Sequence, residues 1–156
     1  MPPSSRLDWV LEALAAFFLV ATPWDVWRHW GDLPARIPMH FNAAGAVDGW
    51  GGKSTLPALL GVMVFVYALL SAASKYQGII NIPMEVDRSS PAVQRLLRSM
   101  VITMKVEVMF LFHYLCHRIM GVAVGVAAGL RMWFLPVVLI GVMIPLVYYM
   151  WRLRRV

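Results

Sequence analysis

Four long apolar blocks alternate with shorter polar segments along the chain. The blocks cover residues 7–27, 56–74, 100–121 and 132–151. A transmembrane helix needs roughly 20 mostly apolar residues to cross about 30 Å of hydrocarbon. Each block supplies about that length. The pattern therefore predicts an all-α integral membrane protein with four transmembrane helices.

Composition strengthens this interpretation. Of the 156 residues, 60% are hydrophobic and only 14% are charged, whereas roughly a quarter of a soluble domain is charged. The net charge of +6 would also suit a nucleic-acid-binding protein. Here, however, the basic residues lie between the apolar blocks and at their ends, which is typical of a protein embedded in a lipid bilayer. We therefore expect the bilayer, and no nucleic acid, as a partner.

The distribution of Lys and Arg predicts the orientation of the chain. If the N-terminus is inside, nine of the 14 basic residues lie on the inner side and five on the outer side. Because positive residues are enriched in cytoplasmic segments, we predict a multi-pass protein of the inner cell membrane with both termini in the cytoplasm. The predicted inner segments are 76–99 and the tail 152–156, both basic, and residues 100–151 are expected to form a transmembrane helical hairpin.

The first outer segment, residues 28–55, has a pattern of its own. Pro38 favours extended backbone in the residue before it, so residues 37–41 are expected to be extended. Residues 42–45 then predict a turn, and Asp48 with the glycine after it predicts a second turn. The sequence thus predicts one extracytoplasmic loop built of short extended segments and turns.

Three polar side chains in this loop, His40, Asn42 and Asp48, have two interpretations. They could converge on a ligand, a peptide or a cation. Alternatively, Asn42 and Asp48 satisfy backbone amides of the turns while Trp50 packs at the lipid headgroups. The sequence supports the two interpretations about evenly.

A dense motif runs through the loop and reads Leu33-Pro34-x-x-Ile37-Pro38-x-His40-Phe41-Asn42-x-x-Gly45-x-x-Asp48-x-Trp50-Gly51-x-Lys53. It resembles the signature of the domain-of-unknown-function family 1648, a helix–loop–helix unit that would cover residues 7–75 here. The same unit forms the first part of the SdpI-like immunity and signalling proteins. The residues that the resemblance singles out, for a ligand or for loop structure, are Pro38, His40, Phe41, Asn42, Gly45, Asp48, Trp50, Gly51 and Lys53.

The resemblance implies a bacterial membrane protein whose role is poorly defined. By analogy, such a protein could act in toxin immunity or envelope signalling when its outer loop meets a peptide or a membrane-protein partner. We carry this function as the leading hypothesis.

The third apolar block is the least typical, because it carries polar residues at helical spacing. At 100° per residue, Glu107, Tyr114 and Arg118 fall on one narrow stripe. Such a face normally turns towards the bundle interior or towards water. Lys105 points nearly the opposite way and is expected to snorkel to the membrane boundary. The polar face comprises Thr103, Glu107, His113, Tyr114, His117 and Arg118.

This polar face supports an alternative function. An acidic group inside a membrane is costly, and by default it indicates a functional site. The face could therefore serve a small transporter or a proton or ion relay. Against this, Glu107 lies close enough to the predicted inner boundary for local pairing to explain it.

Cofactor chemistry and catalysis have little support. His113 and His117 are four residues apart, so both rings could face one metal ion or a haem. A metal site usually has three or four ligands, however, and no Cys-x-x-Cys-His attachment motif is present. Nor does the sequence contain a nucleophile-elbow motif, a phosphate-cradling loop or paired carboxylates. We expect no metal, no cofactor and no enzymatic activity.

Three glycines, Gly121, Gly125 and Gly129, follow at four-residue spacing. Such spacing permits two helices to approach closely. The sequence therefore allows a homo-oligomer, although it equally allows close packing within one chain.

Overall fold

The computed structural model of the chain describes residues 5–76, 78, 80–83 and 85–156. All four helices that it describes are long and apolar enough to cross a membrane, which confirms the predicted fold class. A small sheet lies between the first two helices and forms the extended part of the predicted loop. The elements are α1 (Arg6–His29), β1 (Arg36–Phe41), β2 (Val47–Gly52), α2 (Thr55–Lys75), α3 (Pro91–Ala123) and α4 (Phe134–Leu153).

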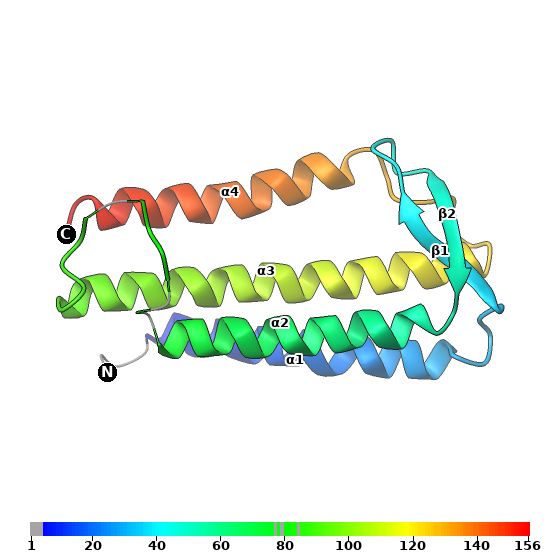
Figure 1. Cartoon of the computed structure of the whole chain (residues 1–156), viewed down its shortest axis with the longest axis horizontal. Coiled ribbons are helices and arrows are strands. Elements are labelled where there is room, and N and C mark those ends of the chain that lie inside the picture. The colour runs from blue at the N-terminus through cyan, green and yellow to red at the C-terminus, as the bar shows by residue number, and fades with distance from the viewer. Residues whose placement is uncertain (1–4, 77, 79, 84) are drawn as a thin grey trace.

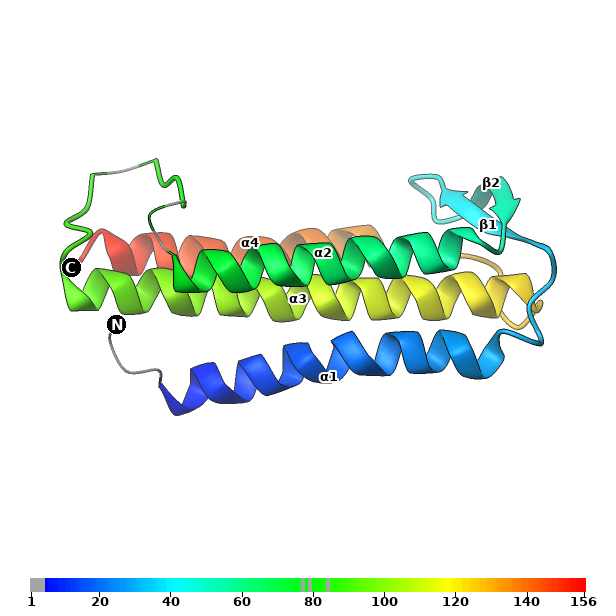
Figure 2. The same ribbon diagram turned by 60° about the horizontal axis from the view of Figure 1, so that its bottom comes forward.

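The helices run side by side as a bundle organised around α3 (Figure 1 and Figure 2). Helix α3 packs against α1, α2 and α4, and α1 also touches α2. Many large apolar side chains of α1, α2 and α4 are exposed, as expected of surfaces that face lipid. Helix α3 buries the largest share of its apolar window, so its side chains meet protein on several sides.

Helix α3 begins before the third apolar block and ends where the glycines begin. Ser90 is its N-cap and Pro91 its first residue, a position that suits proline because no amide donor is needed there. Just before it, the backbone amide and hydroxyl of Ser89 both donate to the Asp87 carboxylate, at 2.9 and 2.5 Å. These hydrogen bonds lower the pKa of Asp87 below its ordinary value, and the bond from the Ser89 hydroxyl has the largest effect.

The three glycines do not form one packing stripe on a helix, as their four-residue spacing had suggested. Gly125 has a φ of +79° and follows the C-cap of α3. Its amide donates to the carbonyl of Val122, and the amide of Val126 donates to the carbonyl of Gly121. This pair of hydrogen bonds is a Schellman motif, which terminates a helix and needs glycine for its left-handed residue. Gly125 and Gly129 therefore shape a connection, and only Gly121 lies on the helix.

The two strands form an antiparallel hairpin at one end of the bundle. The predicted extended segment is β1, and the predicted turn follows it: the Gly45 amide donates to the Asn42 carbonyl at 2.8 Å. The second turn, predicted at Asp48, is wrong because this residue lies inside β2. Gly49 pairs there with His40, beside an irregularity in the register, so pairing with β1 prevails over the local turn preference.

The start of α1 and the end of α4 lie together at the end of the bundle opposite the hairpin (Figure 1). The connection at residues 124–133 lies at the hairpin end. The chain crosses the helical layer four times, so the start of α1 and the end of α4 lie on the same side. The hairpin follows the first crossing and therefore lies on the opposite side.

Candidate functional site

The hairpin is fixed to the bundle through its inner face. Ile37 and Pro38 of β1 are buried, and Phe41 packs against the same core. A two-stranded hairpin alone is marginally stable in water, so these contacts give it a defined position. The core under the hairpin comprises Val26, Leu33, Ile37, Leu56, Cys116, Ile119 and Met120.

Lys53 closes the base of the loop. Its backbone amide donates to the Ala35 carbonyl at 3.0 Å. Its ammonium lies 3.5 Å from the carbonyl oxygens of Trp30 and Leu33 and 4.9 Å from the centre of the Trp30 ring. Lys53 therefore joins the end of α1 to the end of β2, which is a structural role.

Asn42 and Gly45 shape the tip of the hairpin. The Asn42 side-chain oxygen accepts hydrogen bonds from the amides of Ala44 and Ala46, at 3.0 and 3.1 Å. Gly45 has a φ of +79°, and its carbonyl accepts from the Leu130 amide at 2.8 Å. A Cβ at position 45 would collide with the Leu130 carbonyl. The tip is thus clamped to the connection between α3 and α4.

The remaining polar residues of the motif point outwards. His40 Nδ1 and Asp48 Oδ1 are 2.5 Å apart, and their side chains are 72% and 43% exposed. Met39 and Trp50 are also exposed. We call these four exposed residues, Met39, His40, Asp48 and Trp50, the outward face, although the Met39 side chain also reaches the inner side of the hairpin, where it lines a pocket with Ile37, Pro38 and Leu56. Sequence reasoning named three of them but did not pair His40 with Asp48, because their contact depends on the strand register.

Gly51 leaves room for the Met39 side chain. A Cβ at this position would lie 2.6 Å from Cγ of Met39, so any larger residue would displace the methionine. The glycine therefore permits the Met39 side chain to lie across β2.

The polar face of α3 does not act as one unit. Among the described residues, none of its six side chains is hydrogen-bonded to another of the six. His113 lies 3.2 Å from the Thr22 hydroxyl of α1, and His117 lies 3.4 Å from Asp25 of the same helix. The other contacts run towards α4 and the connection before it: Thr103 to Tyr149 at 3.2 Å, Tyr114 stacked on Phe134, and Arg118 donating to the Gly129 carbonyl.

The prediction that Lys105 snorkels to the membrane boundary is wrong. Its side chain is only 1% exposed and lies 2.5 Å from Glu12 Oε2. It also donates to the Ser71 hydroxyl at 3.1 Å and lies 4.9 Å from the Tyr67 ring centre. The reason is that α1 and α2 cover the side of α3 that was expected to face lipid.

Sequence reasoning missed these partners of Lys105. Glu12 lies near the start of the first apolar block, where a charge is not unusual, and Tyr67 and Ser71 carry no signal of their own. One signal was available: Glu12 and Lys105 have opposite charges, and each lies inside an apolar block near the same predicted membrane boundary.

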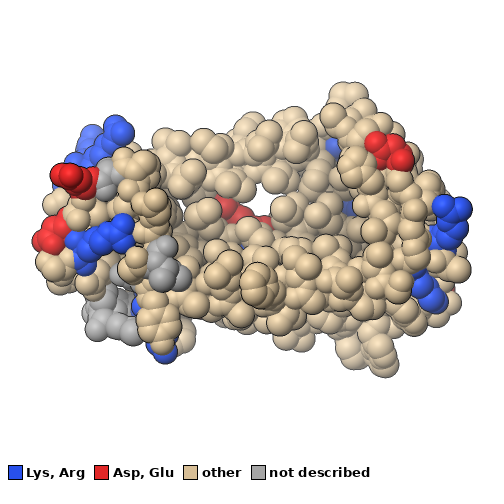
Figure 3. Space-filling view, in the orientation of Figure 1, with Lys and Arg blue, Asp and Glu red and all other residues tan. Residues whose placement is uncertain are grey.

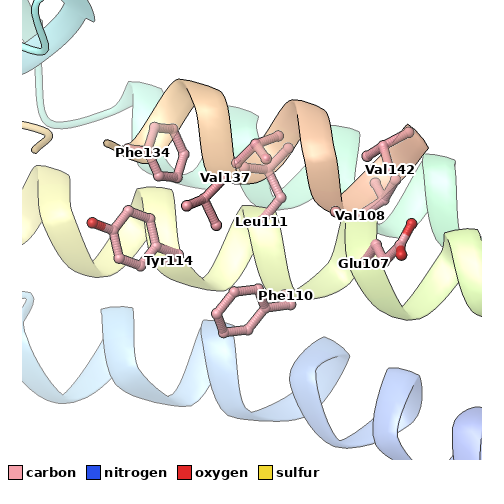
Figure 4. Close-up of a pocket in the computed structure, with 10 residues that line it drawn as sticks. Glu107, Val108, Phe110, Leu111, Tyr114, Phe134, Val137 and Val142 are labelled. Atoms are coloured by element: carbon pink, nitrogen blue, oxygen red, sulfur yellow. The ribbon is translucent and has the colours of Figure 1, made fainter. Parts of the chain in front are cut away.

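Glu107 lies on the other side of α3, facing α4. Its Oε2 atom is buried and has no hydrogen-bond partner among the described residues. It lines a pocket of about 170 Å³ between the two helices. Figure 3 shows a hollow between α4 and the rest of the bundle, with acidic atoms at its floor, and Figure 4 shows the lining side chains.

Within the part of the chain that the structure describes, no group of three or more His, Cys, Asp or Glu side chains could hold a metal ion. Instead, His113 and His117 contact Thr22 and Asp25 separately.

Comparison with family models gives one finding. Residues 14–66 match the family described as "Domain of unknown function (DUF1648)". No curated protein and no solved structure matches the chain. The matched segment contains most of α1, the whole hairpin and the first part of α2. The resemblance of the loop motif is therefore confirmed, and residues 14–66, which form the hairpin and the adjoining parts of α1 and α2, match the DUF1648 family.

Proposed function

We propose that this multi-pass protein is not an enzyme and that it binds a peptide or a membrane-protein partner through the outward face of its hairpin. The observation that carries the proposal is the exposed His40–Asp48 pair, on a hairpin that is otherwise anchored and that also exposes Met39 and Trp50. By its resemblance to the SdpI-like proteins, we assign the binding to toxin immunity or envelope signalling.

The exposed His40–Asp48 contact adds little to the stability of the fold. An ion pair in contact with solvent contributes about 0–1 kcal/mol to folding. The hairpin is held instead by Ile37 and Pro38 beneath it, by Lys53 at its base and by Gly45 at its tip. The pair is therefore free to serve a partner, since a histidine and a carboxylate together supply both donors and acceptors.

The outward face also has the chemistry of a binding surface. Tryptophan is enriched among the residues that dominate binding energy, and methionine adapts its shape to an irregular partner. Because the hairpin is anchored before binding, little conformational entropy is lost when a partner arrives. A small patch with two apolar side chains and one polar pair suits a peptide or a single loop of another protein.

A relay along α3 has less support. Relay function needs polar groups within hydrogen-bonding reach of one another. Five of the six polar side chains of this face contact other elements instead, and Glu107 Oε2 has no partner among the described residues. The outward face of the hairpin is therefore the better candidate.

Photo-crosslinking in growing cells tests the proposal. A photoreactive amino acid at Met39 should yield a discrete adduct with the partner. His40→Ala and Asp48→Asn should each reduce this adduct by about tenfold or more, since loss of a dominant contact costs about 2 kcal/mol. The readout is adduct intensity, normalised to the amount of the protein in the membrane.

Two matched variants control for the loss of a side chain as such. His29→Ala and Asp32→Asn remove the same chemical groups at the same end of the bundle but outside the hairpin; Asp32 is exposed, and His29 is half-buried beside Asp25. Both should leave the adduct unchanged. The proposal fails if His40→Ala and Asp48→Asn also leave it unchanged, or if no adduct forms at Met39 in cells that respond to envelope-directed toxins.

A further inference from the structure

A second site lies away from the hairpin, in the pocket between α3 and α4. The pocket encloses about 170 Å³. A cavity of similar size, about 150 Å³ and lined by apolar side chains, can hold a benzene molecule. The space therefore suits one ring-sized apolar group. We call it the α3–α4 pocket, and it is lined by Glu107, Val108, Phe110, Leu111, Tyr114, Phe134, Val137, Val138, Gly141 and Val142.

Glu107 is the one ionisable acid in this lining. Its buried Oε2 accepts no hydrogen bond from any described residue. The nearest basic residue along the helix, Lys105, is turned away and paired with Glu12. Arg118, three turns further along the helix, donates through Nη2 to the Gly129 carbonyl, and its Nε has no partner among the described residues. A buried carboxylate without a donor or counter-charge is costly, so a positively charged donor placed in the pocket would stabilise it.

The rest of the pocket favours an apolar body of aromatic shape. Tyr114 and Phe134 are stacked, with ring centres 4.8 Å apart. Phe110 lines the pocket at its margin, since its ring points towards α1 and lies 5.5 Å from the ring of Phe18 (Figure 4). Gly141 contributes no side chain on the α4 wall, and a Cβ there would meet no atom within 4 Å. Aromatic faces also attract organic cations.

We propose that the α3–α4 pocket binds a small lipophilic amine. The protonated nitrogen donates to Glu107, and the apolar body occupies the space beside Phe110 and Tyr114. A neutral lipid chain would fill the same volume but would leave the carboxylate without a partner. Because α4 packs chiefly on α3 and the hollow is open at the molecular surface (Figure 3), such an amine can enter sideways from the bilayer.

This site does not depend on the function proposed for the hairpin. It lies within the helical layer, and its lining includes no residue of β1 or β2. A result at either site therefore leaves the other proposal standing.

Binding of a fluorinated phenylethylamine to the full chain in lipid nanodiscs tests the proposal, with ¹⁹F NMR as the readout and empty nanodiscs as the background. We expect saturable binding at one site per chain. Glu107→Gln should weaken it by about tenfold or more, because a hydrogen bond to a charged group contributes about 1.5–3 kcal/mol. Glu85→Gln, which alters an exposed carboxylate, should change nothing.

A second pair of variants tests the space independently of the charge. Gly141→Leu places a side chain in the pocket, whereas Gly61→Leu adds the same side chain on the outer surface of α2. Neither position has an atom within 4 Å of an added Cβ, so both variants should fold. Gly141→Leu should abolish saturable binding and Gly61→Leu should not.

Three results would overturn the proposal. The first is no saturable binding above that of empty nanodiscs. The second is binding that survives both Glu107→Gln and Gly141→Leu. The third is fluorinated ethylbenzene binding as tightly as the amine, which would reduce the pocket to an apolar void.

Discussion

At the scale of single residues, α3 carries two opposite charges in two different environments. Lys105 faces α1 and α2, where Glu12 and Ser71 satisfy its ammonium. Glu107 faces α4, where one of its oxygens is buried without a partner among the described residues. The first arrangement holds three helices together, whereas the second leaves a charge that a ligand can neutralise.

The Lys105–Glu12 pair leads to a prediction about stability. Glu12→Leu should lower the free energy of unfolding by about 3–5 kcal/mol, because it leaves a buried ammonium without its counter-charge. Lys105→Met should cost less, since Glu12 is 26% exposed and its charge stays partly solvated. Unfolding in mixed detergent micelles measures both values.

The double variant Glu12→Leu/Lys105→Met is the informative control. It removes both charges, so it should be more stable than Glu12→Leu alone. A double variant less stable than either single variant would show that the pair is not the source of the effect.

At the scale of elements, the hairpin owes its position to contacts outside the sheet. Lys53 holds its base, and the hydrogen bond from the Leu130 amide to the Gly45 carbonyl holds its tip. The tip contact joins the segment that matches the DUF1648 family to the second half of the chain. It is therefore the point at which the hairpin and the α3–α4 connection constrain each other.

Gly45→Ala should weaken this tip contact. The residue has a φ of +79°, which costs a non-glycine residue on the order of 1–3 kcal/mol, and its added Cβ would also collide with the Leu130 carbonyl. Gly125→Ala is the matched comparison, since it has the same φ but open space around the added atom. We expect Gly45→Ala to be the more destabilising and to speed hydrogen exchange at the Leu130 amide. Equal effects of the two variants would mean that the collision is relieved at no cost.

At the scale of the whole molecule, sequence patterns predicted the helices and the loop but not how they meet. The length of each apolar block directly predicts a transmembrane helix. The prolines and Asn42 predict the first strand and the turn after it. Contacts between elements that are distant in the sequence cannot be predicted from such local patterns. A helical wheel places Lys105 opposite Glu107, yet it does not show that α1 and α2 cover the Lys105 side. Likewise, His40 meets Asp48 only because of the hairpin register.

The orientation of the molecule in the membrane is a prediction from charge. The hairpin and the two terminal helix ends lie at opposite ends of the bundle (Figure 1), so one labelled position at each end decides it. In a Cys116→Ala background, Ala43→Cys at the hairpin tip and Ser89→Cys at the other end both introduce thiols at exposed positions.

A membrane-impermeant maleimide applied to intact cells should label Ala43→Cys and should label Ser89→Cys only after the cells are permeabilised. The reason is electrostatic: with the buried Lys105 left out, eight basic residues lie on the side of the termini and five on the side of the hairpin, and basic segments are retained in the cytoplasm. The reverse labelling would place the outward face of the hairpin in the cytoplasm. Its partner would then have to be a cytoplasmic protein or peptide, and direct contact with an external toxin would be excluded.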